Sequence, residues 1–98
     1  MTAEMIKFRR LLDNAGIEWR DASALDDIEF PITRTHFVFK GYHWSVIHGR
    51  GSYGGIDVFN KRKDEGLLEL MSNAVNEGEP IGWLTAEDAM QMIFEEME

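Results

Sequence analysis

The stretch TRTHFVFKGYHWSVIHG, residues 33–49, restricts the fold more than any other part of the sequence. Two runs rich in aromatic and β-branched residues flank Lys40-Gly41, a pattern that predicts a β-hairpin with a two-residue turn. Across its strands this turn pairs Phe39 with Tyr42, Phe37 with Trp44, and Thr35 with Val46. A slip of one residue would send one strand's aromatic side chains to the opposite face, so we expect this register. Because Lys is not a preferred first turn residue, a longer loop or a bulge is the alternative.

The segment before the hairpin predicts a helix followed by a short strand. Residues 3–15 place apolar side chains at helical spacing, with Thr2 positioned to cap the start and Gly16 positioned to end the helix. IEWRD, residues 17–21, then alternates apolar and charged side chains as a strand does.

The segment after the hairpin predicts two further helices. Residues 67–75 carry apolar side chains at helical spacing, and Gly78 closes the pattern. Residues 85–98 predict the last helix, with Thr85 as its cap and Asp88 at the third helical position, a form of the capping box.

Together these elements predict one globular α+β domain over residues 1–98. We expect a three- or four-stranded antiparallel sheet with about three helices packed on its aromatic face. The fourth, edge strand would be GIDVFN, residues 55–60. The other sheet face is mixed in character and is either exposed or in contact with a partner; it carries Arg34, His36, Val38, His43, Ser45 and Ile47.

HGRGSYGG, residues 48–55, matches the spacing of a dinucleotide-binding turn. That turn needs a strand before it and a helix after it, so that free N–H groups meet the pyrophosphate. The residues that follow alternate as a strand does, so we expect no nucleotide cofactor. The glycines instead allow a sharp bend, or they form an exposed loop in which Arg50 and Tyr53 contact a partner.

Candidate catalytic and metal-binding groups are sparse. His36 and His43 would share a sheet face, but two imidazoles without an acidic neighbour do not make a zinc site, so we expect no metal. The chain has no cysteine, and among its serines only Ser52, near His48, is paired with a candidate base. We therefore predict a protein that is not an enzyme.

Charge divides the chain into two unequal parts. All 10 Lys and Arg lie in residues 1–63, whereas residues 64–98 carry 10 of the 18 acidic residues. A net charge of -8 opposes direct binding to nucleic acid, so a protein is the expected partner. The candidate contacts on the last helix are Glu87, Asp88 and Glu95.

The same acidic helix could instead imitate the phosphate backbone of DNA. Its five acids span a rise of about 16 Å, a lower charge density than the one charge per ~1.7 Å of duplex DNA. A mimic would therefore need further acids, such as Glu65, Glu69, Glu77 and Glu79. A solvated acidic face is the simpler interpretation.

Length and composition indicate the compartment and the oligomeric state. A chain of 98 residues has room for one core with little margin, and a homodimer would add buried surface. It contains no apolar run long enough to span a bilayer and no cysteine for disulfides. We expect a cytoplasmic protein without membrane contact.

Four stretches resemble a group of short uncharacterised proteins encoded by phages and prophages of Gram-positive bacteria. They are KFRRLLDNAGIEW, WSVIHGRGSYGG, GLLELM and GWLTAEDA, and the resemblance that they carry extends over most of the chain. The resemblance implies a setting, a phage protein inside a bacterial host, and no particular site residue or activity.

The sequence thus predicts a non-enzymatic phage-type protein that binds a host or phage protein, as an acidic inhibitor or regulator. One alternative is a small enzyme or ligand-binding domain built around the glycine loop and His48. The other is a virion structural or assembly protein.

Overall fold

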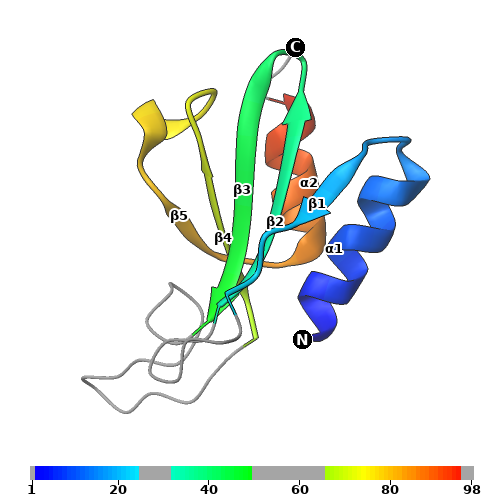
Figure 1. Ribbon diagram of the computed structural model, residues 1–98. Helices are drawn as coiled ribbons and strands as arrows, with labels where there is room; N and C mark the ends of the chain where they lie inside the picture. The colour runs from blue at the N-terminus through cyan, green and yellow to red at the C-terminus, as the bar shows by residue number, and fades with distance from the viewer. Residues whose placement is uncertain (1, 25–31, 50–65, 96–98) are drawn as a thin grey trace.

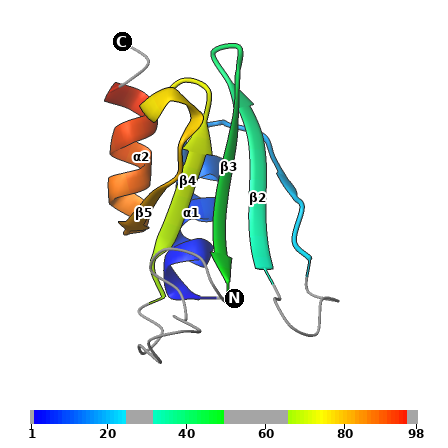
Figure 2. The same ribbon diagram turned by 90° about the vertical axis from the view of Figure 1, so that its left-hand side faces the viewer.

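The computed structural model describes residues 2–24, 32–49 and 66–95. Within these ranges the chain forms a five-stranded antiparallel sheet in the order β1-β2-β3-β4-β5, with both α-helices on one face (Figures 1 and 2). The elements are α1 (Ala3–Asn14), β1 (Trp19–Asp21), β2 (Ile32–Phe39), β3 (Tyr42–Gly49), β4 (Leu68–Ser72), the 3₁₀ turn η1 (Asn76–Gly78), β5 (Ile81–Leu84) and α2 (Ala86–Glu95). The predicted α+β class is confirmed, whereas the sheet has more strands than expected and one α-helix fewer.

The β2–β3 hairpin forms in the predicted register. Phe37 lies opposite Trp44, and their rings stack with centroids 6.2 Å apart and an interplanar angle of 5°. The turn residues Lys40 and Gly41 have φ values of 51° and 84°. Positive φ at both central residues gives the turn the twist that hairpin strands require, so no longer loop is needed.

Helix α1 begins and ends as the sequence predicts. The Thr2 hydroxyl accepts a hydrogen bond from the Met5 N–H at 3.3 Å, and Gly16 follows the helix with a φ of 73°. The buried face of α1 carries Met5, Phe8, Arg9 and Leu12.

The predicted helix over residues 67–75 is wrong, because residues 68–72 form strand β4. Leu68, Leu70 and Ser72 are buried, whereas Glu69 and Met71 lie on the opposite side of the strand. Such a short apolar run fits both the helical and the strand period. Pairing decides between them, since Leu70 lies opposite Val46 and completes the hydrogen bonding of β3.

Strand β5 was not expected, because Pro80 and Gly82 are residues typical of loops. It pairs with β4 through Leu68 opposite Leu84 and Leu70 opposite Ile81, with an irregular register between them. The predicted edge strand over residues 55–60 lies outside the described residues.

Helix α2 confirms the predicted capping box. The Asp88 N–H donates to the Thr85 hydroxyl at 3.1 Å, and the Thr85 N–H donates to the Asp88 carboxylate at 3.2 Å. A further cap comes from α1, because the Ala86 N–H donates to the Glu4 carboxylate at 2.7 Å. The helix start is therefore held both locally and by the neighbouring helix.

Replacing Thr85 with alanine is expected to lower the free energy of unfolding by about 1 kcal/mol, since an unpaired N–H remains at the helix start. Urea denaturation followed by circular dichroism measures the loss. Gln91→Ala is the matched control, because Gln91 is exposed on the same helix and its side chain bonds to the exposed Glu95, outside the capping box. Equal losses for the two variants would contradict a stabilising role for the capping box.

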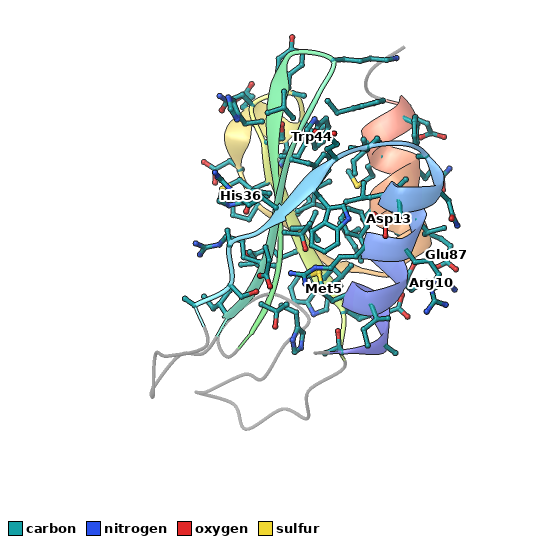
Figure 3. All side chains as sticks on the ribbon, turned by 45° about the vertical axis from the view of Figure 1, so that its right-hand side comes forward. Met5, Arg10, Asp13, His36, Trp44 and Glu87 are labelled. Atoms are coloured by element: carbon teal, nitrogen blue, oxygen red, sulfur yellow. The ribbon has the colours of Figure 1, made fainter. Side chains whose placement is uncertain are left out.

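The core lies between the helices and the sheet (Figure 3). Its central contacts are aromatic: Phe8 of α1 packs against Phe37 at 6.0 Å between ring centroids, and Phe94 of α2 meets Phe39 edge-on at 5.3 Å. Phe94 is still 39% exposed, so it lies at the border of the core. No described helix is long and apolar enough to cross a membrane.

Candidate functional site

Because both described helices cover the same side of the sheet, the described elements leave its other side open (Figure 2). We call this side the outer sheet face. It is formed by the outward-pointing residues of β1 to β4: Arg20, Ile32, Arg34, His36, Val38, His43, Ser45, Ile47, Glu69 and Met71. Six of these belong to the mixed face that the sequence predicted; Val38 and His43 are exposed, and the other four are partly buried.

Strand pairing brings the basic side chains of this face together. Arg20 of β1 lies directly opposite His36 of β2, and Arg34 precedes His36 by two residues on the same face. His43 of β3 is a diagonal neighbour, because its direct partner is Val38. Direct partners in a sheet have Cβ atoms about 5 Å apart and diagonal ones about 7 to 8 Å apart. The four basic groups therefore form one compact cluster.

No acidic side chain interrupts this cluster within β1, β2 and β3. Glu18 precedes β1 at one border, and Glu69 lies on β4 at the other. The two ion pairs among the described residues join Lys7 to Glu87 and Arg9 to Asp21, so Arg20 and Arg34 take part in neither. In a chain of net charge -8, the part of the outer sheet face formed by β1, β2 and β3 is thus basic, whereas β4 adds the acidic Glu69.

The surroundings of His36 act on its protonation. Partial burial, and then the positive charges of Arg34 and Arg20, lower the pKa of His36 below its ordinary value of 6.5. The imidazole is therefore neutral at neutral pH. As the pH falls, His36 is protonated in the unfolded chain at a higher pH than in the folded chain. The folded state therefore loses stability as the pH falls below about 6.5.

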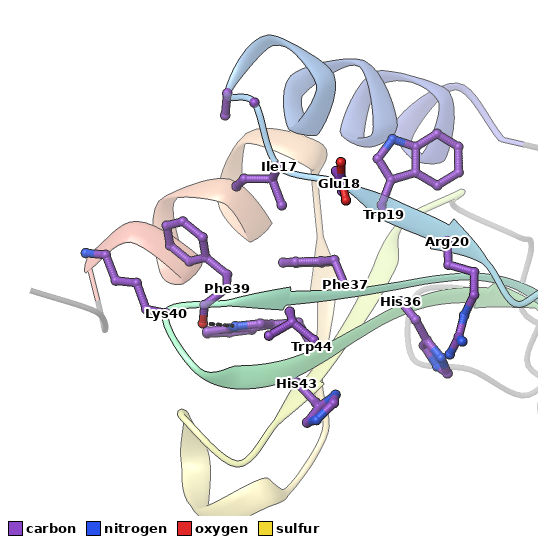
Figure 4. Close-up of a pocket in the computed structure, with 13 residues that line it drawn as sticks. Ile17, Glu18, Trp19, Arg20, His36, Phe37, Phe39, Lys40, His43 and Trp44 are labelled. Atoms are coloured by element: carbon purple, nitrogen blue, oxygen red, sulfur yellow. Dashed lines mark hydrogen bonds between the residues drawn. The ribbon is translucent and has the colours of Figure 1, made fainter.

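A groove of about 720 Å³ opens at the β1–β2 edge and continues the outer sheet face around that edge (Figure 4). It exists because β1 is short: pairing ends at Trp19 opposite Phe37, and the last residues of β2 extend beyond it. Ile17, Phe37 and Phe39 line it from the core side, whereas Arg20, His36 and His43 border it from the outer side.

The three predicted contacts on α2 are exposed and lie on the helix-covered side of the molecule. Glu87 forms an ion pair with Lys7, which lowers the pKa of Glu87 through a hydrogen bond. Asp88 belongs to the capping box, and Glu95 accepts a hydrogen bond from the Gln91 amide at 2.9 Å. Each of these acids therefore already has a partner within the domain. None of the three is part of the outer sheet face.

The remaining candidates of the sequence analysis surround the glycine loop. Arg50, Tyr53 and Ser52 lie outside the described residues. His48 lies opposite Thr33, a buried residue of the core side, so its side chain is on the face opposite to His36 and His43. It does not line the edge groove. Among the described residues, no group of three His, Asp or Glu side chains could hold a metal ion.

The members of the outer sheet face on β1 and β4 were not predicted. Arg20 could have been placed there, because IEWRD alternates and Trp19 belongs to the core side. Met71 could not, because its segment was predicted to be helical. Its position follows from the pairing of Ser45 with Met71.

The fold defines an α+β protein with a helix-covered antiparallel sheet. Comparison of the chain with protein-family models, with curated proteins and with solved structures found no match.

Proposed function

We propose that this protein acts without catalysis, by binding another protein through its outer sheet face. The observation that carries the proposal is the exposure of apolar side chains beside the basic cluster: Val38 is 56% exposed and Met71 is 42% exposed. Apolar side chains next to arginines are typical of protein interfaces, where burial supplies affinity and charge supplies orientation.

The outer sheet face is a better candidate than the acidic face of α2. Glu87 forms an ion pair with Lys7, and Asp88 belongs to the capping box at the helix start. A partner that bound these acids would have to displace contacts that the domain already makes. Arg20 and Arg34 take part in no ion pair among the described residues, and a partner's carboxylates could approach them without that cost.

The resemblance to phage proteins supports a setting for this activity. In that setting the protein works in the cytoplasm of a bacterial host, and its partner is a host or phage protein that it inhibits or regulates. The acidic α2 then keeps the free protein soluble and leaves the outer sheet face for recognition.

Photo-crosslinking in Gram-positive bacterial cells tests the interface. A photoreactive amino acid at Val38 or Met71 is expected to give a discrete, heavier protein adduct, because both side chains would be buried against the partner. The matched control position is Ile6, which is 46% exposed on α1. Adducts from Gln91 of α2, with none from Val38 or Met71, would contradict the proposal and move the interface to the acidic helix.

A further inference from the structure

The charge of the outer sheet face also restricts the chemistry of the partner. We infer that the surface bound there is an acidic, partly apolar protein segment, whose carboxylates meet Arg20 and Arg34 and whose apolar side chains cover Val38 and Met71. This inference rests on the proposed function and adds the class of partner to it.

The first support is local charge. β1, β2 and β3 present two guanidinium groups and two imidazoles on this face and no carboxylate among their described residues, whereas β4 adds Glu69 beside Met71. Charges on the surface are screened over about 8 Å at physiological ionic strength, so the nearby arginines outweigh the acids of α2 on the other side of the sheet. An acidic segment is therefore attracted here despite the net negative charge of the chain.

The second support is the apolar component of the same surface. Val38 lies opposite His43, and Met71 lies opposite Ser45, so each exposed apolar side chain is next to a polar one. Ile47 adds a half-buried apolar side chain next to Arg34. A segment with both carboxylates and apolar side chains satisfies the two kinds of group, whereas a purely charged ligand would leave the apolar ones in contact with water.

The distribution of aromatic residues favours protein over nucleic acid. Sheets that bind single strands stack bases on exposed aromatic rings. In β2 and β3 the register places Phe37, Phe39 and Trp44 on the helix-covered side. Among the residues of β1 to β4 that define the outer sheet face, the only aromatic side chains are its imidazoles; Trp83, which is 51% exposed, lies beyond them on β5. The face also lacks the basic density that a phosphate backbone requires.

His36 makes this surface sensitive to pH. Arg20 and Arg34 face it from β1 and β2, His43 faces it from β3, and its partner Ser45 separates it from Met71 of β4. Bound carboxylates favour the protonated imidazole, which the arginines disfavour in the free protein. Acidification therefore adds positive charge where the partner binds, and affinity rises as the pH falls.

A titration of the isotope-labelled full chain, followed by the shifts of its backbone amide signals, tests the inference. The probe is a synthetic peptide of about ten alternating Glu and Val residues, long enough to span the strands. Its matched controls are the same peptide with Lys in place of Glu, and an oligothymidylate of equal charge. We expect the acidic peptide alone to shift the signals of β1, β2 and β3, and to bind more tightly as the pH is lowered.

Charge variants locate the contact. The Arg20→Gln/Arg34→Gln double variant is expected to weaken binding of the acidic peptide about tenfold, at the upper end for two exposed ion pairs. Arg10→Gln is the control, because Arg10 is an exposed arginine of α1 on the helix side of the molecule (Figure 3), and it should change affinity less than about twofold. His36→Gln should flatten the pH dependence and leave binding at neutral pH in place.

Each other outcome overturns the inference. The inference of an acidic partner is wrong if the Lys peptide binds equally well or if no probe binds. It is also wrong if the double variant keeps its affinity or if the signal shifts are confined to the helices. Tighter binding of oligothymidylate would assign the surface to nucleic acid. If Val38 still crosslinks to a protein in cells, the proposed function stands and only the class of partner is wrong; if it does not, the proposed function itself fails.

Discussion

Replacing Trp44 with alanine is expected to lower the free energy of unfolding by about 3 to 5 kcal/mol, the range measured for large aromatic residues in cores. Trp44 is 1% exposed, stacks on Phe37 and donates its indole N–H to the Phe39 carbonyl at 3.4 Å. The loss is a large share of the roughly 5 to 15 kcal/mol that stabilises a small domain. Urea denaturation followed by circular dichroism measures it.

Two further variants keep this prediction testable even where Trp44→Ala folds poorly. Trp44→Phe retains an aromatic ring against Phe37 and should lose less than half as much stability. Ile6→Ala removes an apolar side chain that is 46% exposed and should change stability by less than about 1 kcal/mol. A loss for Trp44→Ala no greater than that for Ile6→Ala would show that Trp44 is not a central core residue.

The second large effect concerns Arg9, a charged side chain of α1 that is buried between the helix and the sheet. Its Nε donates to the Thr35 hydroxyl at 2.7 Å and its Nη2 to the Arg34 carbonyl at 3.1 Å, while the guanidinium lies 4.7 Å from the ring centroid of Trp19. Arg9→Ala is expected to cost about 3 kcal/mol, because buried acceptors lose a charged donor. Most of this cost comes from Thr35 and the Arg34 carbonyl, since the ion-pair partner Asp21 is well exposed.

The neighbouring arginine supplies the control for this prediction. Arg10→Ala removes the same group from an exposed position on α1 and should change stability by less than about 0.5 kcal/mol. Arg9→Lys keeps the charge but cannot reach both acceptors with one planar group, so it should lose more than half as much as Arg9→Ala. Similar denaturation midpoints for Arg9→Ala and Arg10→Ala would contradict the structural role of the buried guanidinium.

Arg9 also shows how much the sequence leaves open. Its neighbours Phe8 and Leu12 belong to the apolar stripe of α1, and nothing local distinguishes Arg9 from the exposed Arg10. Its burial depends on Thr35, 26 residues away, which supplies the acceptor. The outer sheet face could likewise be predicted only in part. Alternation in the hairpin placed His36 and His43 on one face, but only the pairing of β1 with β2 brings Arg20 opposite His36.

By itself the sequence determined the elements whose information is local. A two-residue turn between alternating aromatic strands permits one register, and caps such as Thr2 and Thr85 specify where helices begin through hydrogen bonds to nearby residues. Only the tertiary structure decided the state of residues 68–72 and 81–84. The apolar pattern of residues 68–72 fits a helix or a strand, whereas residues 81–84 follow Pro80 and include Gly82, which are typical of loops. The edge of β3, whose backbone groups need partners, makes β4 a strand, and β5 then pairs with β4.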